Sequence, residues 1–367
     1  MKITKIELFE AIMSFTTTKF TEKRWGKPAF PDTIVAIHTD EEIVGWGESC
    51  PLGPTYLRAT SGGLRAVLAI LAPKLIGQDP RELGVIDHIM DTAMLGHLSA
   101  KAAIDMACWD ILGKTSNLPL KTLLGGAKVN KVPVYKVIGT DEPSAMVAEY
   151  EQARSEGFFQ FQVKLGIGGS ADIERMRAIG SIMRPNERVI FDANRGWSMA
   201  EARRVAIAAN QLDPALDFFF EQPCLTYEES LTIRRLCQRP FVMDEVIDDL
   251  NDLVRAINDE ALDAVAIKLS HAGGLTKARE MIAVALRAGV MVRIEDTIGA
   301  DFVRTAVAHL ASTIPPKMLL TSYPHPSEVV IGHTETRLEN GFMNAGDRPG
   351  HGVRPNFEEL GEPIAVY

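Results

Sequence analysis

Six apolar runs between residues 160 and 296 each end on a charged residue, and these endings recur at nearly even spacing. The charged endings are Lys164, Asp192, Glu221, Asp244, Lys268 and Glu295. Successive members lie 28, 29, 23, 24 and 27 residues apart. One strand and its following helix in a (β/α)₈ barrel need about 30 residues. The spacing therefore predicts consecutive parallel strands of such a barrel, each with a charged residue at the carboxyl end, where barrel active sites are built.

Alternation along these runs assigns the polar side chains to one side of the predicted sheet. Neighbouring residues of a strand point to opposite faces, so residues two apart share a face. Gln160, Gln162 and Lys164 therefore share a face of one strand, and Arg293 and Glu295 share a face of another. With the charged endings facing inward, the residues between them face the helices. The polar groups are thus predicted to converge on one barrel interior.

Composition limits the classes of protein to which this chain can belong. Its 367 residues suffice for more than one domain, and 46% hydrophobic with 24% charged residues is typical of a soluble globular protein. A formal net charge of −9 disfavours a nucleic-acid binder. No apolar run approaches the ~18 residues of a membrane span, and the alternating first residues indicate a strand and not a signal peptide. Four scattered cysteines predict reduced thiols and a cytoplasmic location.

Two patterns divide the chain into predicted domains. Residues 1–125 begin with alternating strands, to about residue 50, and continue with helical periodicity from residue 62. Pro119 and the pair at 125–126 end that periodicity, and we place a domain boundary there. Strand and helix patterns alternate from residue 132 to residue 323, which predicts a barrel domain over 126–325. Residues 326–367 contain several Gly and Pro and are predicted to return to the first domain.

Two loops of the first domain are rich in Gly, Pro or polar residues. The segment 14–31 joins the first two strands, and the segment 50–56 reads Cys-Pro-Leu-Gly-Pro-Thr-Tyr. A loop as long as the first is usually functional or disordered. Either loop alone is explained by an ordinary surface connection. Together they are predicted to be lids over a pocket, with Tyr56 contacting the substrate.

Asp192, Glu221 and Asp244 offer three hard oxygen ligands from adjacent strands. A single acidic residue at a strand end is more often a turn or cap residue, but three in register on neighbouring strands favour a metal site. Magnesium prefers a few carboxylates and leaves its remaining positions to water or substrate. Because the set contains no His or Cys, zinc is disfavoured. The sequence therefore predicts one Mg²⁺ at these residues.

Lys164 and Lys268 end the second and sixth strands, on opposite sides of the predicted barrel. They are either structural partners of the acidic residues or two proton-transfer groups on opposite faces of a bound substrate. A lysine with its ordinary pKa of about 10.4 is a poor base at neutral pH. Burial and a nearby divalent cation disfavour its charged form and lower that pKa. A cation also stabilises the oxygens of a carboxylate whose α-proton has been removed.

Several motifs resemble one family, and the resemblance covers essentially the whole chain. They are Gly-Trp-Gly-Glu at 45–48, the helix at 102–114, Leu-Leu-Gly-Gly at 123–126, Asp-Ala-Asn at 192–194, Glu-Gln-Pro at 221–223, Asp-Glu at 244–245, and Lys268. The sequence is similar to the enolase superfamily, in its mandelate racemase and muconate lactonizing enzyme branch. That resemblance implies an α/β enzyme in which an α+β capping domain, made from both termini, covers a (β/α)₇β modified TIM barrel. It also implies Mg²⁺ on the three carboxylates and an acid/base pair of Lys164 and Lys268.

Two positions distinguish this chain from parts of that family. Mandelate-racemase-like members carry His at the seventh strand end, where this chain has Glu295 and Asp296, so the resemblance favours the muconate-lactonizing-like subgroup. That subgroup usually has Lys-x-Lys on the second strand, where this chain has Gln162-Val-Lys164. The cation that helps to lower the pKa of the second lysine is therefore missing from that strand. Either Mg²⁺ and burial suffice to lower the pKa of Lys164, or Lys164 is a weaker base than usual.

Loop and strand-eight residues narrow the substrate class that the resemblance implies. Dipeptide epimerases of the subgroup share Asp-x-Asp on strand eight, and here 320–323 reads Leu-Thr-Ser-Tyr. The segments 45–56 and 294–296 look most like those of hydroxyproline and proline-betaine 2-epimerases and cis-3-hydroxyproline dehydratases. We expect a cyclic amino acid of the proline type, with its nitrogen near Glu295 or Asp296 and Tyr323 beside it. A buried acidic pair is costly without a cationic partner, and the substrate ammonium would supply one.

Several activities remain open within that substrate class. A racemase or 2-epimerase of such an amino acid is placed first, with one lysine on each face of the α-carbon, although the sequence does not choose between this reaction and elimination. The same pair serves anti elimination from cis-3-hydroxyproline, which is the first alternative. A muconate-type cycloisomerase follows, and a catalytically silent amino-acid-binding barrel is least favoured, because all ligands and both lysines are present. We expect a small-molecule carboxylate substrate, a homo-oligomer, and no nucleic-acid or membrane partner.

Further polar residues lie close to these positions in the sequence. The residues expected to orient the metal ligands are Asn194, Glu245, Gln162 and Arg195. His271 follows the second lysine by three residues. It either reaches the pocket or has a helix-start or surface role.

Overall fold

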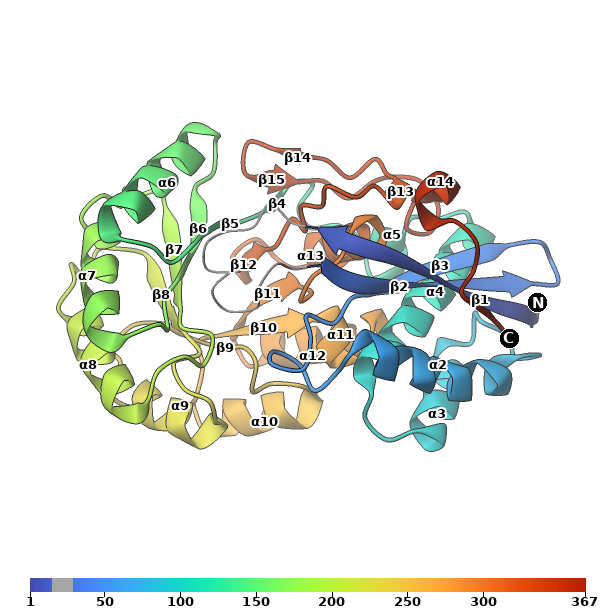
Figure 1. Cartoon of the computed structure of the whole chain (residues 1–367), viewed down its shortest axis with the longest axis horizontal. Coiled ribbons are helices and arrows are strands. Elements are labelled where there is room, and N and C mark those ends of the chain that lie inside the picture. The colour runs from blue at the N-terminus through green and yellow to red at the C-terminus, as the bar shows by residue number, and fades with distance from the viewer. Residues whose placement is uncertain (15–28) are drawn as a thin grey trace.

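The computed structural model describes residues 1–14 and 29–367, which form two parts (Figure 1). One part is a sheet with helices at the end of the molecule that carries both termini. The other part is a set of parallel strands surrounded by helices. Most of the predicted lid at 14–31 lies outside the described residues, so its role stays a prediction. No helix of the described part is long and apolar enough to cross a membrane.

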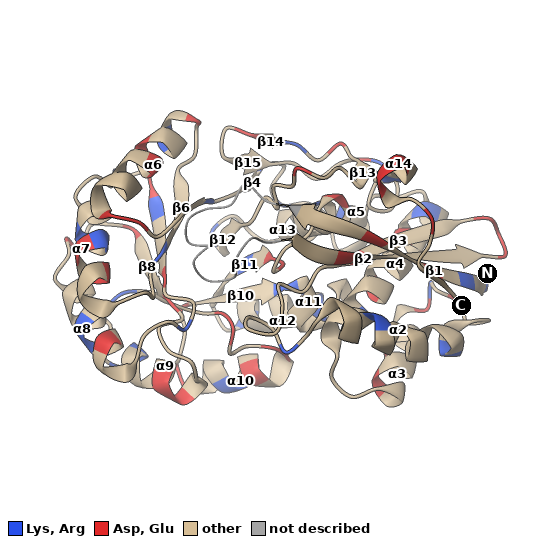
Figure 2. Ribbon diagram, viewed as in Figure 1, with Lys and Arg blue, Asp and Glu red and all other residues tan. Residues whose placement is uncertain are grey.

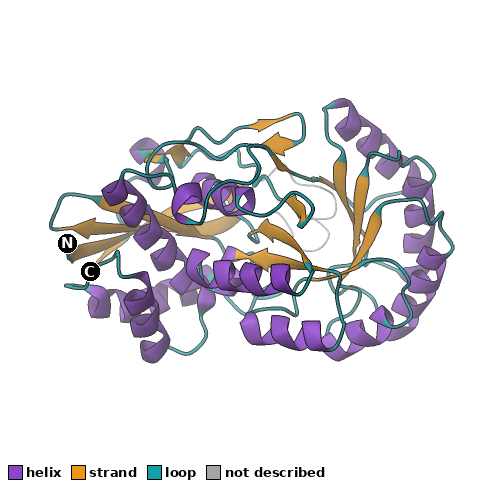
Figure 3. Cartoon of the chain, turned by 180° about the vertical axis from the view of Figure 1, so that it is seen from behind, coloured by secondary structure: helices purple, strands orange, loops and turns teal. Residues whose placement is uncertain are grey.

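The first part is a four-stranded antiparallel sheet with the order β17-β1-β2-β3. Its strands are β1 (Ile3–Ser14), β2 (Ala29–Thr39), β3 (Val44–Ser49) and β17 (Ala365–Val366). The helices of this part are α2 (Ser61–Leu75), α3 (Leu83–Ala93), α4 (Leu98–Ser116) and α5 (Leu120–Leu123). Because β17 pairs with β1, the end of the chain returns to the sheet that the first residues form. Both termini therefore lie at the same end of the molecule (Figures 1 and 3).

Alternation along β3 explains the Gly-Trp-Gly-Glu motif. A Cβ atom on Gly45 or Gly47 would lie 2.2 or 2.0 Å from a backbone oxygen of α4, so only glycine allows the helix to approach this closely. Trp46 stacks on Phe302 of α13 (Asp301–Ser312), with ring centroids 5.9 Å apart. The strand therefore joins α4 on one face to a barrel helix on the other.

The second part contains eight parallel strands in the order β5 to β12. The strands are β5 (Lys136–Ile138), β6 (Gln160–Lys164), β7 (Arg188–Asp192), β8 (Phe218–Glu221), β9 (Phe241–Met243), β10 (Ala264–Lys268), β11 (Met291–Glu295) and β12 (Leu319–Ser322). A parallel bridge between Val134 and Ser322 joins the last strand to the segment just before the first. The predicted charged endings thus lie at the ends of six consecutive parallel strands, β6 to β11.

Helices follow the first seven of these strands and cover the outside of the sheet (Figure 3). They are α6 (Pro143–Ser155), α7 (Gly169–Gly180), α8 (Met199–Asn210), α9 (Tyr227–Arg234), α10 (Leu250–Asn258), α11 (Leu269–Ala272) with α12 (Leu275–Arg287), and α13. Reciprocal hydrogen bonds between Ser198 and Glu201 begin α8, and α9 begins in the same way. Charged residues mark the outer helices α7 to α10 (Figure 2). The arrangement is the (β/α)₇β barrel that the sequence resemblance implies.

An apolar layer fills the barrel beneath the charged strand ends. Its members are Ile190, Phe219, Val242, Ala264 and Leu320, which form a cluster separate from the main core. The first three precede a predicted metal ligand by two residues and so share its face of the sheet. The alternation inferred from the sequence is therefore confirmed, with apolar residues below the charged ones.

The first predicted barrel strand, at 132–138, is divided in the structure. Its beginning, β4 (Val132–Pro133), pairs antiparallel with β15 (Phe342–Met343) of the tail. The chain then changes partners, because the N–H of Tyr135 donates to the oxygen of Ser322 at 3.1 Å before β5 begins. The remaining tail elements are β13 (Gly332–His333), β14 (Leu338–Glu339), β16 (Arg354–Pro355) and α14 (Phe357–Leu360). The tail thus contacts the barrel side before it reaches the first sheet.

Candidate active site

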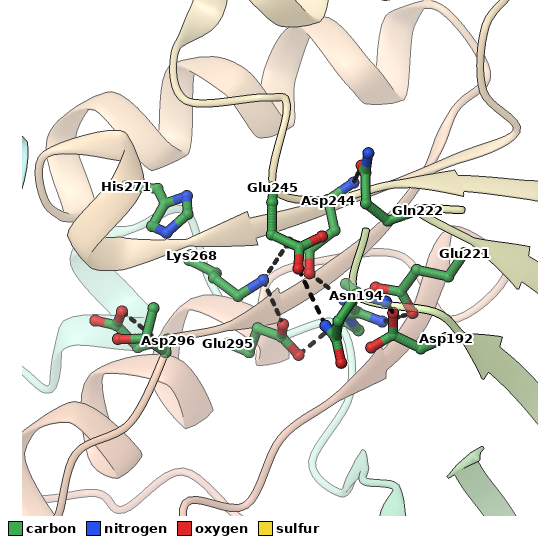
Figure 4. A network of polar contacts seen from close by, with 12 residues as sticks. Asp192, Asn194, Glu221, Gln222, Asp244, Glu245, Lys268, His271, Glu295 and Asp296 are labelled. Carbon is green, nitrogen blue, oxygen red and sulfur yellow. Dashed lines mark hydrogen bonds and ion pairs between the residues drawn. The ribbon is translucent and has the colours of Figure 1, made fainter. Parts of the chain in front are cut away.

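The charged strand ends lie next to one another across the sheet. In the strand registers Asp192 is paired with Lys164 on one side and with Glu221 on the other. Lys268 is paired with Glu295 in the same way. All of these except Lys164 are buried. The strands therefore bring the predicted catalytic and metal-binding residues into one row of charges. Figure 4 shows Lys268 and the acidic members of this row.

Two of the three predicted metal ligands form ion pairs with the two predicted catalytic lysines. Lys164 Nζ donates to Asp192 Oδ2 at 2.6 Å. Lys268 Nζ donates to Asp244 Oδ1. The exposed fractions of Asp192 and Asp244 are 0% and 2%, so neither carboxylate has bulk water to stabilise its charge. The sequence analysis left structural pairing and proton transfer open for these lysines, and the pairs themselves are present.

The Lys268–Asp244 pair changes the pKa of both of its members. Burial acts to raise the pKa of Asp244, but the charges of Lys268 and Arg293 outweigh it and lower this pKa to about 2. Burial acts to lower the pKa of Lys268, but the charge of Asp244, followed by Tyr56 and Glu295, raises it well above the ordinary value. These contacts therefore favour the protonated form of Lys268.

Glu221, the third predicted ligand, contacts side chains from two other strands. Arg293 of β11 donates from Nη1 to Oε2 at 2.7 Å and from Nη2 to Oε1 at 2.5 Å. Gln162 of β6 donates to the same Oε2 at 3.2 Å. Both Glu221 and Arg293 are fully buried. Burial raises the pKa of Glu221 to about 8, because the charges of Asp192 and Asp244 oppose the stabilising effect of Arg293.

Glu295 has cationic partners inside the protein. Lys268 Nζ lies 3.1 Å from its Oε1, and Arg293 Nε lies 3.0 Å from its Oε2. Tyr135 Oη also donates to Oε2, at 2.8 Å. The sequence argument for a substrate ammonium at Glu295 assumed that this carboxylate lacks an internal cation, and that assumption is wrong. A contact between Glu295 and the substrate stays a prediction without that electrostatic reason.

Asp296 is held by hydrogen bonds from neighbouring backbone and hydroxyl groups. Its carboxylate accepts from the N–H of Ser270 at 3.1 Å and of Thr297 at 2.7 Å, and from the Ser270 hydroxyl. Its own N–H donates to His325 Nε2 at 3.0 Å. Burial raises the pKa of Asp296, and the hydrogen bond from Ser270 opposes this rise. These contacts fix the loop after β11 against α11.

The residues expected to orient the ligands make contacts of the required kind. The N–H of Asn194 donates to Asp192 Oδ1 at 2.7 Å, and its side-chain amide donates to Glu245 Oε1 at 3.1 Å. Asn194 and Arg195 have positive φ angles of 41° and 65°, a strained conformation that concentrates at functional sites. Arg195 Nη2 donates to the carbonyl oxygen of Tyr56 at 3.0 Å. The turn after β7 therefore connects a predicted ligand to the 50–56 loop.

A cavity of about 660 Å³ is lined by residues of this row and of the surrounding loops. Both predicted catalytic lysines line it, and so do the four predicted substrate contacts Tyr56, Glu295, Asp296 and Tyr323. Phe30, at the described end of the predicted first lid, is another lining residue. Lys268 Nζ lies 5.7 Å from the centre of the Tyr56 ring. The second predicted lid therefore lies at the cavity. Closure by the first lid stays a prediction, because most of that segment lies outside the described residues.

The donor set fits Mg²⁺, although its carboxylates are directed at protein cations. Within residues 1–14 and 29–367, no three His, Cys, Asp or Glu side chains are arranged as a group that could hold a metal. The three predicted ligands nevertheless present hard oxygen atoms from neighbouring strand ends. Beside them, the buried Oε2 of Glu245 meets no hydrogen-bond partner among the described residues, and burial together with Asp244 and Asp192 raises the pKa of Glu245 to about 7. Buried carboxylates crowded in this way favour a divalent cation.

His271 is buried in α11 and is not among the lining residues of the cavity. Its Nδ1 lies 3.4 Å from Asp248 Oδ1. Figure 4 shows its ring to one side of Lys268, away from Asp192 and Glu221. Of the two roles considered from the sequence, the structure favours the one in the helix.

Arg293 and Tyr135 contact the row of charges, and the sequence analysis assigned no role to either. A signal for Arg293 was present, because it shares a strand face with Glu295 and an arginine inside a barrel needs acidic partners. No comparable signal existed for Tyr135, whose partner Glu295 lies 160 residues further along the chain. Sequence periodicity assigns a face to each residue but does not say which side chains meet across the barrel.

Two family descriptions match most of the chain. Residues 29–125 match the N-terminal domain of the mandelate racemase / muconate lactonizing enzyme family. Residues 145–360 match the family described as enolase C-terminal domain-like. The two matches cover β2, β3 and the helices of the first part, and nearly all of the barrel.

Individual proteins are similar over the full length. A cis-3-hydroxy-L-proline dehydratase from Roseibium aggregatum is 42% identical over 373 residues, which is 100% of both chains. An N-succinyl-L-Arg/Lys racemase from Bacillus cereus is 28% identical and covers 99% of this chain and 98% of its own. A mandelate racemase/muconate lactonizing enzyme from Roseovarius nubinhibens, crystallised with magnesium, is 34% identical with a TM-score of 0.93, covering 100% of this chain and 99% of its own.

Proposed function

Since this chain belongs to the mandelate racemase/muconate lactonizing enzyme family of the enolase superfamily, we propose that it dehydrates a proline-type cyclic amino acid, cis-3-hydroxyproline. The protein is an enzyme, and its relatives are racemases, epimerases, cycloisomerases and a dehydratase. The observation that carries the choice of dehydration is the 42% identity, over the full length, to a cis-3-hydroxy-L-proline dehydratase. That reaction was the first alternative of the sequence analysis, which preferred epimerisation.

Asp192, Glu221 and Asp244 would hold one Mg²⁺ at the ends of β7, β8 and β9. Support comes from the all-oxygen donor set and from the magnesium in the similar Roseovarius nubinhibens structure. When bound, the ion would supply positive charge to the substrate carboxylate, whose oxygens become more negative when the α-proton leaves. The protein's own groups must then position the ring and move two protons.

Lys164 and Lys268 are the proposed proton-transfer groups. They extend from β6 and β10, with three strands between them, and both line the cavity. In cis-3-hydroxyproline the carboxylate and the hydroxyl share one ring face, so the α-hydrogen lies on the face opposite the hydroxyl. Elimination is therefore anti, and it needs a base on one face and an acid on the other. Two lysines on separated strands satisfy that requirement.

The proposed elimination conserves atoms and electrons without a further reactant. One lysine takes the α-proton, and the electrons of the broken C–H bond form the new C=C bond. The C–O bond breaks with its electron pair on oxygen, and the second lysine donates the proton that completes a water molecule. The resulting cyclic enamine can tautomerise to an imine. The lysine protonation states after one turnover are exchanged, and proton transfer with solvent restores them.

Epimerisation at the α-carbon is a second candidate, because the pair of lysines serves it equally well. After one lysine has removed the α-proton, the other can return a proton to the opposite face. A substrate without a leaving group at the third ring carbon then undergoes inversion and not elimination. The same site can support both outcomes, and the substrate decides between them.

A substrate screen in deuterated water tests the proposal. Purified enzyme with Mg²⁺ would be incubated with the cis-3- and trans-3-hydroxyproline isomers, trans-4-hydroxyproline and proline. We expect loss of one water from the cis-3 isomer by mass spectrometry and none from the trans-3 isomer, whose α-hydrogen and hydroxyl share a face. Inversion with α-deuterium but without water loss would favour the epimerase. Turnover of muconates or N-succinyl amino acids alone would contradict the substrate class.

A further inference from the structure

The shortest ion pair of each predicted metal ligand is with a different cation, and the three cations are not equivalent. Asp192 and Asp244 are paired with lysines, whereas Glu221 is paired with Arg293. A lysine can lose its proton and act as a base, but a guanidinium stays protonated in proteins. Among these three pairs, Arg293 therefore provides the charge that proton transfer cannot remove.

Arg293 contacts carboxylates from three strands. Besides its two hydrogen bonds to Glu221 of β8, its Nε lies 3.0 Å from Glu295 Oε2 of β11. Its Nη2 lies 3.5 Å from Oδ2 of Asp244, which follows β9. The side chain is fully buried and is not among the residues that line the cavity. Arg293 thus touches the predicted metal ligands and a lysine partner, but not the space for the substrate.

Gln162 approaches the same atom as Arg293 from the other side of the barrel. Its Nε2 donates to Glu221 Oε2 at 3.2 Å, and Arg293 Nη1 donates to that oxygen at 2.7 Å. A lysine at position 162 would reach one atom further than glutamine and would place its charge at this oxygen. The second strand instead carries a neutral amide here, and the positive charge comes from β11.

We propose that Arg293 is a positioning residue whose permanent charge fixes Glu221, a role that a cation at position 162 could also fill. With Glu221 fixed by arginine, neither lysine has to remain charged to hold this ligand in place. The role in catalysis rests on the proposed function, in which Lys164 and Lys268 transfer protons. The role in neutralising Glu221 does not rest on it. The alternative is that Arg293 and Glu221 form an ion pair that only stabilises the fold. Moving the positive charge from position 293 to position 162 distinguishes the two roles.

The first test measures thermal stability in chelator without substrate. Arg293→Met keeps much of the side-chain volume but leaves Glu221 without its cation, and we expect its Tm to fall by about 5–10 °C. Adding Gln162→Lys should recover at least half of that loss, because the new ammonium reaches the same carboxylate oxygen. The matched control is Gln160→Lys with Arg293→Met. Gln160 shares the strand face but lies one layer deeper, so its lysine should restore nothing.

The second test measures kinetics with the identified substrate at saturating Mg²⁺. Residues that orient metal ligands typically change activity by about 10–100-fold when they are lost, and we expect a fall in kcat of that size for Arg293→Met. KM should change little, because Arg293 does not line the cavity. Gln162→Lys should raise the kcat of the Met variant at least tenfold. Arg293→Lys, which keeps a charge on β11, should lie between the wild type and Arg293→Met.

The outcomes separate this inference from the proposed function. Wild-type stability and kcat in Arg293→Met would overturn it, and so would equal rescue by lysine at 160 and at 162. If Arg293→Met does not fold, folding of the double variant with Gln162→Lys supports the inference, and failure of both variants to fold overturns it. The Tm measurements use neither substrate nor metal. A protein that shows the expected Tm pattern but ignores every proline derivative would therefore disprove only the proposed function.

Discussion

Two groups of buried carboxylates in this protein are neutralised in different ways. At the barrel mouth, the three predicted metal ligands each contact a lysine or an arginine. Between the first sheet and the barrel, Glu48 accepts from backbone N–H groups, and Asp32 lies next to it. We call these the mouth cluster and the seam pair. Both are almost completely buried, so each must meet the cost of burying negative charge.

Glu48 caps a helix that belongs to the other part of the molecule. Its carboxylate accepts from the N–H groups of Phe302 at 3.1 Å and Val303 at 3.0 Å, and also from that of Ala300. These groups begin α13, whose own N-cap residue is Ala300 and has no side chain that could accept them. The free N–H groups of a helix start favour a negative charge. Glu48 of β3 thus caps α13, although it lies far from that helix in the sequence.

Asp32 and Glu48 are neighbouring buried carboxyls, and each raises the cost of a negative charge on the other. Neither carboxylate oxygen of Asp32 meets an N–H or O–H donor from the described residues. The two carboxyls can therefore hydrogen bond only when one of them is protonated. Burial, and then the charge of Glu48, raises the pKa of Asp32 well above its usual value, so Asp32 is the member that carries the proton.

The two groups have different roles: the mouth cluster serves the proposed reaction, and the seam pair stabilises the fold. Lysine ammonium groups can release protons, and their carboxylate partners can bind a metal ion or remain paired. The helix N–H groups that contact the seam pair do not release protons in this way. The seam pair therefore holds two parts of the molecule together and takes no part in proton transfer. Removing a cation from the mouth cluster should therefore change activity most, and altering the seam pair should change stability most.

Metal removal should have the largest effect and should act on the mouth cluster alone. Chelator-treated enzyme is expected to lose turnover to the background rate, and added Mg²⁺ should restore it. Circular dichroism should stay unchanged, because the seam pair and the apolar core contain no proposed metal ligand. Turnover assays before and after dialysis measure this. Full activity in the presence of chelator would remove the basis for the metal assignment.

Replacement of either lysine should have the next largest effect. Lys164→Ala and Lys268→Ala are each expected to lower kcat by about 10²–10⁴-fold, the usual contribution of a proton-transfer group. Deuterium exchange at the α-carbon should survive in either variant for one enantiomer at most, because one lysine serves each face. Lys136→Ala is the control, since Lys136 also lines the cavity but is 43% exposed. Near-normal turnover in either active-site variant would exclude the two-lysine assignment.

The mouth cluster could be placed from the sequence because its signals are local. Strand periodicity and spacing predicted that Lys164, Asp192, Glu221, Asp244 and Lys268 end consecutive strands, and the structure brings them together. Family resemblance, and not spacing, implied the capping domain and the cofactor. The sequence did not predict which cations neutralise the cluster, because two inward-facing residues on different strands can meet in several ways.

The seam pair shows the limit of sequence analysis more clearly. Glu48 was recognised only as part of a motif, and its partners lie more than 250 residues away in α13. Asp32 carried no signal, because its burial depends on how β2 packs against the barrel. Pairing across 132–138 was missed for the same reason, since the N–H of Val134 donates to Gly341 of the tail and the N–H of the next residue, Tyr135, donates to Ser322 of the barrel. Local patterns predict elements and faces, whereas tertiary packing selects the partners.

Loss of the Glu48 carboxylate should destabilise the fold with little effect on chemistry. Glu48→Ala leaves buried N–H groups at the start of α13 without an acceptor, and we expect a loss of about 2–4 kcal/mol in the free energy of unfolding. Denaturant titration measures this. The specific activity of the folded fraction should remain within a few-fold of the wild type. Glu201→Gln is the control, because Glu201 caps α8 at an exposed site and should cost well under half as much.

Asp32→Asn should alter the pH dependence of stability more than stability itself. The raised pKa means that the native state keeps a proton on Asp32 at pH values where the unfolded chain, with an Asp pKa near 3.9, has released it. Stability contributed by this proton is complete below the unfolded pKa and is lost as the pH rises through the folded pKa. An asparagine amide donates permanently to Glu48 and binds no proton. The variant should therefore lose this slope and gain on the order of 1 kcal/mol relative to the wild type at high pH.

Denaturant titrations between about pH 5 and about pH 9 measure that slope, and a second aspartate provides the control. The pKa of Asp79 is lowered to about 2, chiefly by the hydrogen bond from Arg81, so both its folded and unfolded forms are ionised throughout this range. Asp79→Asn should shift the stability curve without changing its slope. Parallel curves for Asp32→Asn and the wild type would mean that the seam pair holds no shared proton. The mouth cluster and the seam pair would then differ only in their partners, because a proton would neutralise neither of them.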